Sequence, residues 1–178
     1  MNVTVYLGSR HGADPAYIEL TRDLGRWIGR HHTLIYGGGQ TGLMGELADA
    51  ALDQGGTVIG VIPRFLAARE IIHESLAEIY TTTTMSERKQ KMIDLGDAFI
   101  AMPGGPGTLE EIAEIISLKR LHRIDGPCIL FNYKGYYNPL KELLYHMVNQ
   151  DFTTKEDTDI IQFVNSIDEI KKMIGPCK

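Results

Sequence analysis

Short runs rich in β-branched residues alternate along the chain with longer stretches of helical period. The runs are VTVYL, TLIYG, TVIGVI, EIYTTT, DAFIAM and PCILF, and the helices are expected over Pro15–Arg30, Leu43–Gln54, Met85–Leu95, Thr108–Leu121 and Asn138–Gln150. This alternation is typical of βαβ units and a parallel sheet. The runs are almost continuously apolar, as expected when helices cover both faces of the sheet. The pattern therefore predicts an α/β fold with a doubly wound, Rossmann-like parallel sheet and helices on both faces.

The tail from Asp151 contains a further candidate strand, DIIQFV, and a short helix that starts near Ser166. No low-complexity linker separates this tail from the rest of the chain. A chain of 178 residues with 43% hydrophobic residues can bury a core of its own without disulfides or a structural metal. We therefore expect residues 1–178 to form a single domain.

The beginning of the sequence, MNVTVYLGSRHG, lacks the basic start and apolar run of a secretory signal, and no later stretch is apolar for the length of a membrane span. A soluble, cytoplasmic protein is expected. Cys128 lies in an apolar run and Cys177 lies next to the C-terminal residue, so no disulfide framework is indicated.

The formal net charge is −5, whereas nucleic-acid binding usually requires a basic stripe or domain. We expect no nucleic-acid partner, and an anionic ligand must be held by local groups. The six histidines show no metal-ligand spacing, so no metal site is expected.

Three turns that follow predicted strands are rich in glycine: Gly8–Gly12, Gly37–Gly42 and Pro103–Thr108. Ligands of doubly wound sheets bind outside the carboxyl ends of the strands, where these turns lie. In the third turn, glycines precede a helix whose free N–H groups can hold an anion, and Thr108 adds a hydroxyl. We interpret it as a phosphate cradle; the alternative is that its glycines only permit a tight turn.

The second turn matches G-x-G-x-x-G through Gly37, Gly39 and Gly42, which raises the alternative of a dinucleotide-dependent oxidoreductase. The motif follows the second strand instead of the first, and the next strand, TVIGVIP, lacks the expected acidic residue. No Gly-Lys-Ser or Gly-Lys-Thr follows any of the turns, which excludes a P-loop.

Charged residues accompany the third turn. Glu111 lies one turn into the helix, yet Thr108-Leu109-Glu110-Glu111 also has the pattern of a capping box, in which Glu111 would only bond the helix start. The upstream segment Glu87-Arg88-Lys89 either faces the cradle or forms a solvated helix face. The residues alone leave both alternatives open.

Together these motifs resemble the Lonely Guy (LOG) family of cytokinin-activating phosphoribohydrolases. The family marker P-G-G-x-G-T-x-x-E is present as Pro103–Glu111, and its E-R-K segment is Glu87-Arg88-Lys89. Further matching segments are GSRHG, YGGGQTGLMG, VIGVIPRFL and Gly135–Leu140, so the resemblance covers about residues 3 to 152.

The resemblance implies an N-glycosidase that hydrolyses a cytokinin riboside 5′-monophosphate or AMP, with Arg88 and Glu111 as the catalytic pair. Such a hydrolysis needs no metal or redox cofactor. The resemblance also implies a homodimer whose partner helps to close the active site. The substrate-binding residues it implies are Gly8, Ser9, Glu70, Met85, Lys89, Gly104, Gly105, Pro106, Gly107, Thr108 and Ser117, the last replacing a threonine. The alternative is a non-catalytic nucleotide-binding or carrier protein with the same fold.

The chain departs from the LOG pattern at three places. Ser86 replaces the histidine common before E-R-K, Arg10 replaces a small residue in the first turn, and Leu118–His122 replaces a more aromatic, glycine-containing stretch. These departures leave the hydrolytic motifs intact, but the identity of the nucleobase in the substrate stays open.

Overall fold

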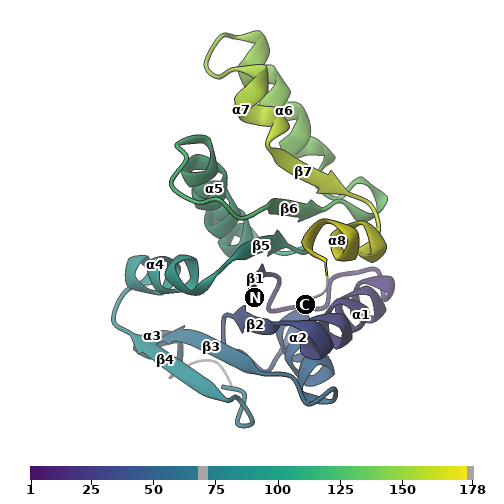
Figure 1. Ribbon diagram of the computed structural model, residues 1–178, viewed down its shortest axis with the longest axis vertical. Coiled ribbons are helices and arrows are strands. Elements are labelled where there is room, and N and C mark those ends of the chain that lie inside the picture. Colours follow the sequence, from purple (N-terminus) through teal and green to yellow (C-terminus); the bar gives the residue numbers. More distant parts are fainter. Residues whose placement is uncertain (68–71, 176–178) are drawn as a thin grey trace.

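The computed structural model describes residues 1–67 and 72–175, which build a seven-stranded sheet flanked by helices (Figure 1). The strands are β1 (Asn2–Tyr6), β2 (Thr33–Tyr36), β3 (Val58–Pro63), β4 (Glu78–Thr82), β5 (Ala98–Ala101), β6 (Cys128–Phe131) and β7 (Ile161–Val164). Every neighbouring pair is parallel, in the order β4-β3-β2-β1-β5-β6-β7.

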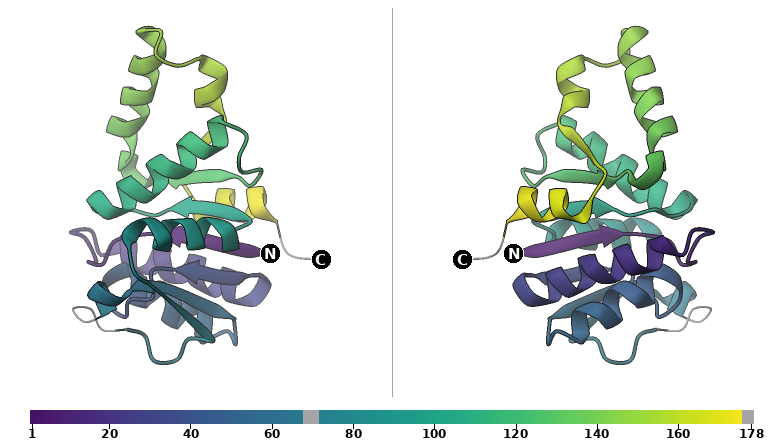
Figure 2. Two further views of the ribbon diagram at one scale, coloured as in Figure 1. Left: turned by 90° about the vertical axis from the view of Figure 1, so that its left-hand side faces the viewer. Right: turned by 90° about the vertical axis from the view of Figure 1, so that its right-hand side faces the viewer.

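Helices cover both faces of this sheet, as Figure 2 shows from two sides. They are α1 (Ala16–His31), α2 (Gly42–Leu52), α3 (Arg64–Ala67), α4 (Met85–Leu95), α5 (Pro106–Arg120), the 3-10 turn η1 (Tyr133–Gly135), α6 (Asn138–Asn149), α7 (Lys155–Asp159) and α8 (Ile167–Ile174). One core cluster joins apolar residues of α1, α2 and α8 to the sheet, and a second joins residues of α4, α5 and α6. The prediction of a doubly wound, Rossmann-like α/β fold is confirmed.

The chain reverses its direction across the sheet between β1 and β5. The first four strands extend from β1 to one edge, and the chain then returns to place β5 on the other side of β1, with Tyr6 opposite Ala101. The loops after these two strands meet, because the N–H of Gly8 donates to the Pro103 carbonyl at 3.2 Å. This is the switch point at which such sheets bind ligands.

The expected strand in the tail is present as β7, and Ser166 caps α8 by accepting from the Glu169 N–H. Three short elements were not predicted: α3, η1 and α7. Each has five residues or fewer, too few for a helical period to be visible in the sequence. Helix α5 begins at Pro106, two residues before the predicted start, since proline is well suited to the first helical position.

No helix in the described ranges is long and apolar enough to cross a membrane. Cys128 is buried in β6, where burial raises the pKa of its thiol to about 12. Cys177 lies outside the described residues.

Candidate active site

The loop after β5 forms the start of α5 without a side-chain cap. Gly105 occupies the N-cap position with an extended backbone, and Pro106 follows as the first helical residue. Thr108 therefore lies inside the first turn, so the capping box suggested by Thr108 and Glu111 is not formed. Glu111 is free of that structural role and its side chain is buried.

The glycines of this loop serve two different purposes. A Cβ atom at Gly104 would overlap the Thr108 hydroxyl, so Gly104 is required by packing. A Cβ atom at Gly105 or Gly107 would meet nothing within 4 Å. These two positions thus leave open space next to the backbone at the helix start, where N–H groups have no helical partner.

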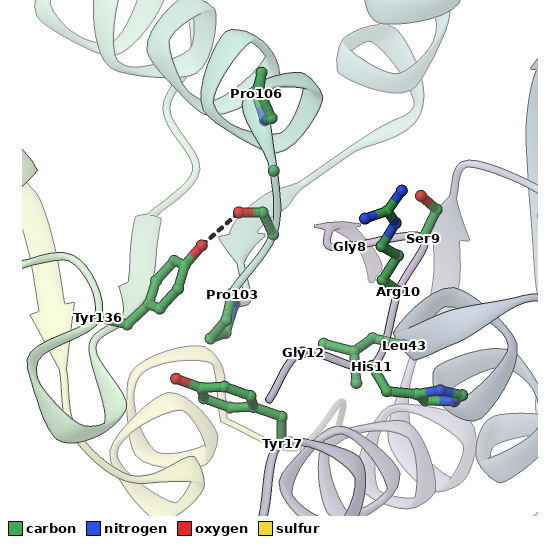
Figure 3. Close-up of a pocket in the computed structure, with 12 residues that line it drawn as sticks. Gly8, Ser9, Arg10, His11, Gly12, Tyr17, Leu43, Pro103, Pro106 and Tyr136 are labelled. Carbon is green, nitrogen blue, oxygen red and sulfur yellow. Dashed lines mark hydrogen bonds between the residues drawn. The ribbon is translucent and has the colours of Figure 1, made fainter. Parts of the chain in front are cut away.

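Tyr136 fixes the orientation of the peptide between Gly104 and Gly105. Its hydroxyl donates a hydrogen bond to the Gly104 carbonyl (Figure 3). Because a peptide group is planar and, as here, trans, the N–H of Gly105 points to the opposite side of the loop. The neighbouring Tyr137 hydroxyl donates to the Met102 carbonyl at 2.7 Å and holds the end of β5 in the same way.

The three charged side chains of the segment Glu87-Arg88-Lys89 make different contacts. Thr84 caps α4 by accepting from the Glu87 N–H, and the Glu87 carboxylate accepts from the Thr83 N–H at 2.8 Å. Lys89 forms ion pairs of 2.9 Å with Glu110 and 3.1 Å with Glu114 of α5. Only Arg88 turns toward the sheet, so the alternative of a fully solvated face is wrong for this residue.

Arg88 and Glu111 meet between α4 and α5. The Arg88 Nη1 atom lies 3.6 Å from Glu111 Oε1, and the two side chains are 11% and 9% exposed. Arg88 Nε also donates to the Val61 carbonyl at 3.1 Å. A Cβ atom at Gly37 would overlap the guanidinium group, so the glycine-rich turn after β2 makes room for this arginine. That gives Gly37 a purpose other than dinucleotide binding.

Burial raises the pKa of the Glu111 carboxyl to about 7, although the positive charges of Arg88 and Lys89 act in the opposite direction. Burial penalises the charged form of a carboxyl group, and an ion pair at 3.6 Å compensates only part of that penalty. A carboxyl group with such a pKa exchanges protons readily near neutral pH.

Two adjoining cavities open at the carboxyl ends of β1 and β5. One has a volume of about 280 Å³ and contains the pair Arg88 and Glu111; Figure 3 shows the other, of about 470 Å³, lined by residues that include Arg10, Tyr17 and Tyr136. Both are bordered by Gly8, Ser9, Gly105 and Pro106. The start of the loop after β5 and the turn after β1 thus form a border that the two cavities share.

The structure places most of the predicted site residues around these cavities. The smaller cavity is lined by Gly8, Ser9, Met85, Arg88, Gly105, Pro106, Gly107, Thr108 and Glu111, and Gly104 borders the larger one. Lys89 borders neither, and Ser117 is exposed on α5 nearly two turns beyond Glu111. Glu70 lies outside the described residues.

Several lining residues were not singled out from the sequence as ligand-binding. They include Arg10, Tyr17, Leu43, Met44, Leu66 and Tyr136. Tyr136 belongs to the segment Gly135–Leu140, whose resemblance to the LOG family could have pointed to it. The apolar residues have the pattern of core positions and offer no such indication.

Among the described residues, no three His, Cys, Asp or Glu side chains are grouped so that they could hold a metal ion.

The sequence of residues 44–174 matches the model of a family described as "possible lysine decarboxylase". A cytokinin riboside 5′-monophosphate phosphoribohydrolase of Rhodococcoides fascians is 45% identical over 86% of this chain and 78% of that protein. The cytokinin riboside 5′-monophosphate phosphoribohydrolase LOG3 of Arabidopsis thaliana is 38% identical over 98% of this chain and 83% of that protein.

Similar solved structures show the same fold at lower identity. A molybdenum cofactor binding protein from Rippkaea orientalis has a TM-score of 0.72 and 22% identity, covering 98% of this chain and 97% of that chain. The molybdenum cofactor carrier protein from Chlamydomonas reinhardtii has a TM-score of 0.70 and 21% identity, with 97% of each chain covered. Given the sequence matches, the chain belongs to the Lonely Guy family of cytokinin riboside 5′-monophosphate phosphoribohydrolases.

Proposed function

We propose that the protein hydrolyses the N-glycosidic bond of a cytokinin riboside 5′-monophosphate or of AMP and releases the free base and ribose 5-phosphate. The observation that carries the proposal is the buried pair of Arg88 and Glu111 in a cavity whose wall is the Gly105–Thr108 loop. Membership of the phosphoribohydrolase family supports the same reaction class.

Glu111 acts at the anomeric carbon. As the bond from this carbon to the base nitrogen breaks, its electron pair leaves with the base and positive charge develops on the ribose. A carboxylate beside the ribose stabilises that charge and polarises the water molecule whose oxygen bonds to the carbon. The raised pKa of Glu111 makes it a stronger proton acceptor than an ordinary carboxylate. It takes the proton released from water and passes it on to the departing nucleobase.

Arg88 holds the nucleotide and balances charge. Its guanidinium group remains cationic, and its bond to the Val61 carbonyl and its position beside Gly37 restrict its orientation. It either donates to the ribose hydroxyls or stabilises negative charge on the departing base. In either role Arg88 acts next to Glu111, so the two side chains must remain close together.

The phosphate group binds at the start of α5, remote from the bond that breaks. The open space beside Gly105 and Gly107 admits an oxygen anion to the free N–H groups of the helix, with the Thr108 hydroxyl nearby. This anchor orients the ribose with respect to Glu111, so part of the binding energy contributes to the rate.

We also propose that the protein acts as a homodimer in which a second copy covers the site. A groove of about 570 Å³ extends from Gly104, Gly105 and Pro106 across the exposed side chains of Leu109 and Leu143. These leucines are each 48% exposed, and burying them against another copy removes apolar surface from water. The groove is continuous with the loop that holds the phosphate, so a second copy there narrows the entrance to the site.

The base is identified by incubating the purified protein with nucleoside 5′-monophosphates that carry prenylated adenine, adenine, guanine or a pyrimidine, and measuring the released base. We expect release from adenine-type substrates. A protein that binds these nucleotides in equilibrium dialysis but releases no base would instead be a carrier, which is the principal alternative for this fold.

A further inference from the structure

The proposed phosphate site has little positive charge of its own. A phosphate monoester carries a charge of about −1.5 to −2 at neutral pH, and a helix N-terminus offers roughly half a positive charge. Lys89 is engaged by Glu110 and Glu114, and Arg88 by Glu111 and the Val61 carbonyl. In a chain of net charge −5, a further cation beside the loop would strengthen the binding of a phosphate.

Arg10 lies where such a cation would act. It follows Ser9 in the turn after β1 and borders the 470 Å³ cavity together with Gly104, Gly105 and Pro106. In residues 1–67 and 72–175 its side chain has no hydrogen-bond or ion-pair partner. The adjacent His11 differs, because it is paired with Glu46 at 3.1 Å.

The two walls of this cavity present complementary groups. In Figure 3, Ser9 and Arg10 lie together on one side of the opening, and Pro103, Pro106 and Tyr136 lie on the other. Because Tyr136 holds the Gly104 carbonyl on its own side, the N–H of Gly105 is directed away from Tyr136. One cavity is thus bordered by Gly105 with its backbone donor, by Ser9 with its hydroxyl and by Arg10 with its guanidinium group.

We infer that Arg10 is a substrate-binding residue that supplies the counter-charge for the 5′-phosphate, opposite the start of α5. The inference rests on the proposed function, because it assumes that the loop from Gly105 to Thr108 holds this phosphate. A guanidinium group can bind two phosphate oxygens through parallel hydrogen bonds, which a small residue cannot do. Arg10 thereby adds affinity for the phosphorylated substrate and for the product ribose 5-phosphate.

The test is calorimetric binding of ribose 5-phosphate, which requires no turnover, to the wild-type protein and to Arg10→Ala, Arg10→Lys and Arg120→Ala. Arg10→Ala is expected to raise Kd about ten- to a hundredfold, as for loss of a hydrogen bond between charged groups. The Kd of Arg10→Lys should lie between those of the wild type and Arg10→Ala, since lysine keeps the positive charge but lacks the planar guanidinium group. Arg120→Ala removes the same charge from the exposed far end of α5 and should bind like the wild type.

The outcomes separate the two levels of the proposal. Unchanged Kd in Arg10→Ala, with normal binding by the wild type, would overturn the role of Arg10 and leave the phosphate site intact. Equal weakening in Arg120→Ala would show a general effect of net charge and would also overturn it. If the wild type binds ribose 5-phosphate no better than ribose, the phosphate site itself is wrong, and the proposed function fails with it. In steady-state assays, Arg10→Ala should raise KM for the nucleotide more than it lowers kcat.

Discussion

Burial of Glu111 disfavours the charged form of its carboxyl group, and its pKa rises to about 7 from the value of 4.5 in a model peptide. The folded protein therefore binds this proton more tightly than the unfolded chain does. Stability contributed by the protonated carboxyl is fully present below about pH 4.5 and is lost as the pH rises to about 7. At higher pH the fold is less stable by roughly 3 kcal/mol than it would be with the carboxyl protonated, and this difference already includes the opposing effect of Arg88 and Lys89.

Glu111→Gln removes this charge and keeps a side chain of the same shape. We expect release of the nucleobase to fall by about a hundredfold or more, because glutamine cannot accept the proton from water. The free energy of unfolding, measured by urea at pH 5, 6, 7 and 8, should decline with pH less in the variant than in the wild type. In the wild type, kcat/KM should rise through about pH 7, where the carboxylate forms.

Arg88→Ala serves as the companion variant, since it leaves the carboxyl buried without its ion pair. Activity close to that of the wild type in either folded variant would remove that residue from the catalytic assignment. A Glu111→Gln protein that fails to fold would show that the carboxylate is structural.

At the scale of elements, consecutive glycines in the loop between β5 and α5 differ in their surroundings: Gly104 is required by packing against Thr108, and Gly105 borders open space. Sequence reasoning located this loop and the order of the main strands and helices, because periodicity and turn residues are local signals. It placed the start of α5 at Thr108 instead of Pro106, and so left a capping box open for Glu111. It could not distinguish Gly104 from Gly105, since that difference depends on where the Thr108 side chain lies.

Gly105→Val and Gly104→Ala form a matched pair that tests this division. A side chain at Gly105 enters open space, so thermal stability should stay near that of the wild type while activity on monophosphates falls at least tenfold by obstruction of the phosphate. Gly104→Ala must displace Thr108 and should destabilise the protein by about 1 to 3 kcal/mol. A Gly105→Val enzyme with full activity would show that no ligand approaches this backbone.

At the scale of the whole molecule, the switch between β1 and β5 brings together residues from distant parts of the chain. Arg88 comes from α4, Glu111 from α5 and Arg10 from the turn after β1. No local pattern in the sequence indicates that Arg10 and Tyr136 border the same cavity, because their proximity depends on the order of the strands in the sheet. We propose that residues 1–178 fold as one domain, which predicts a single cooperative unfolding transition.

The proposed dimer is tested by light scattering coupled to size-exclusion chromatography. We expect twice the 19.9 kDa mass of the chain for the wild type and a shift toward one chain mass for Leu109→Glu/Leu143→Glu. A wild-type protein that elutes as a single chain at assay concentration would contradict the dimer. Lys172→Glu, on α8 at a distance from the groove, is the control for an added negative charge.

The central claim is that the phosphate, held at the start of α5, orients the glycosidic bond against Arg88 and Glu111. It is tested most directly by measuring kcat/KM for release of adenine from AMP and from adenosine, side by side with the same preparation. The account predicts that AMP is preferred by at least about a hundredfold, because the helix N-terminus acts only on the charged group. Equal kcat/KM values for AMP and adenosine would contradict it.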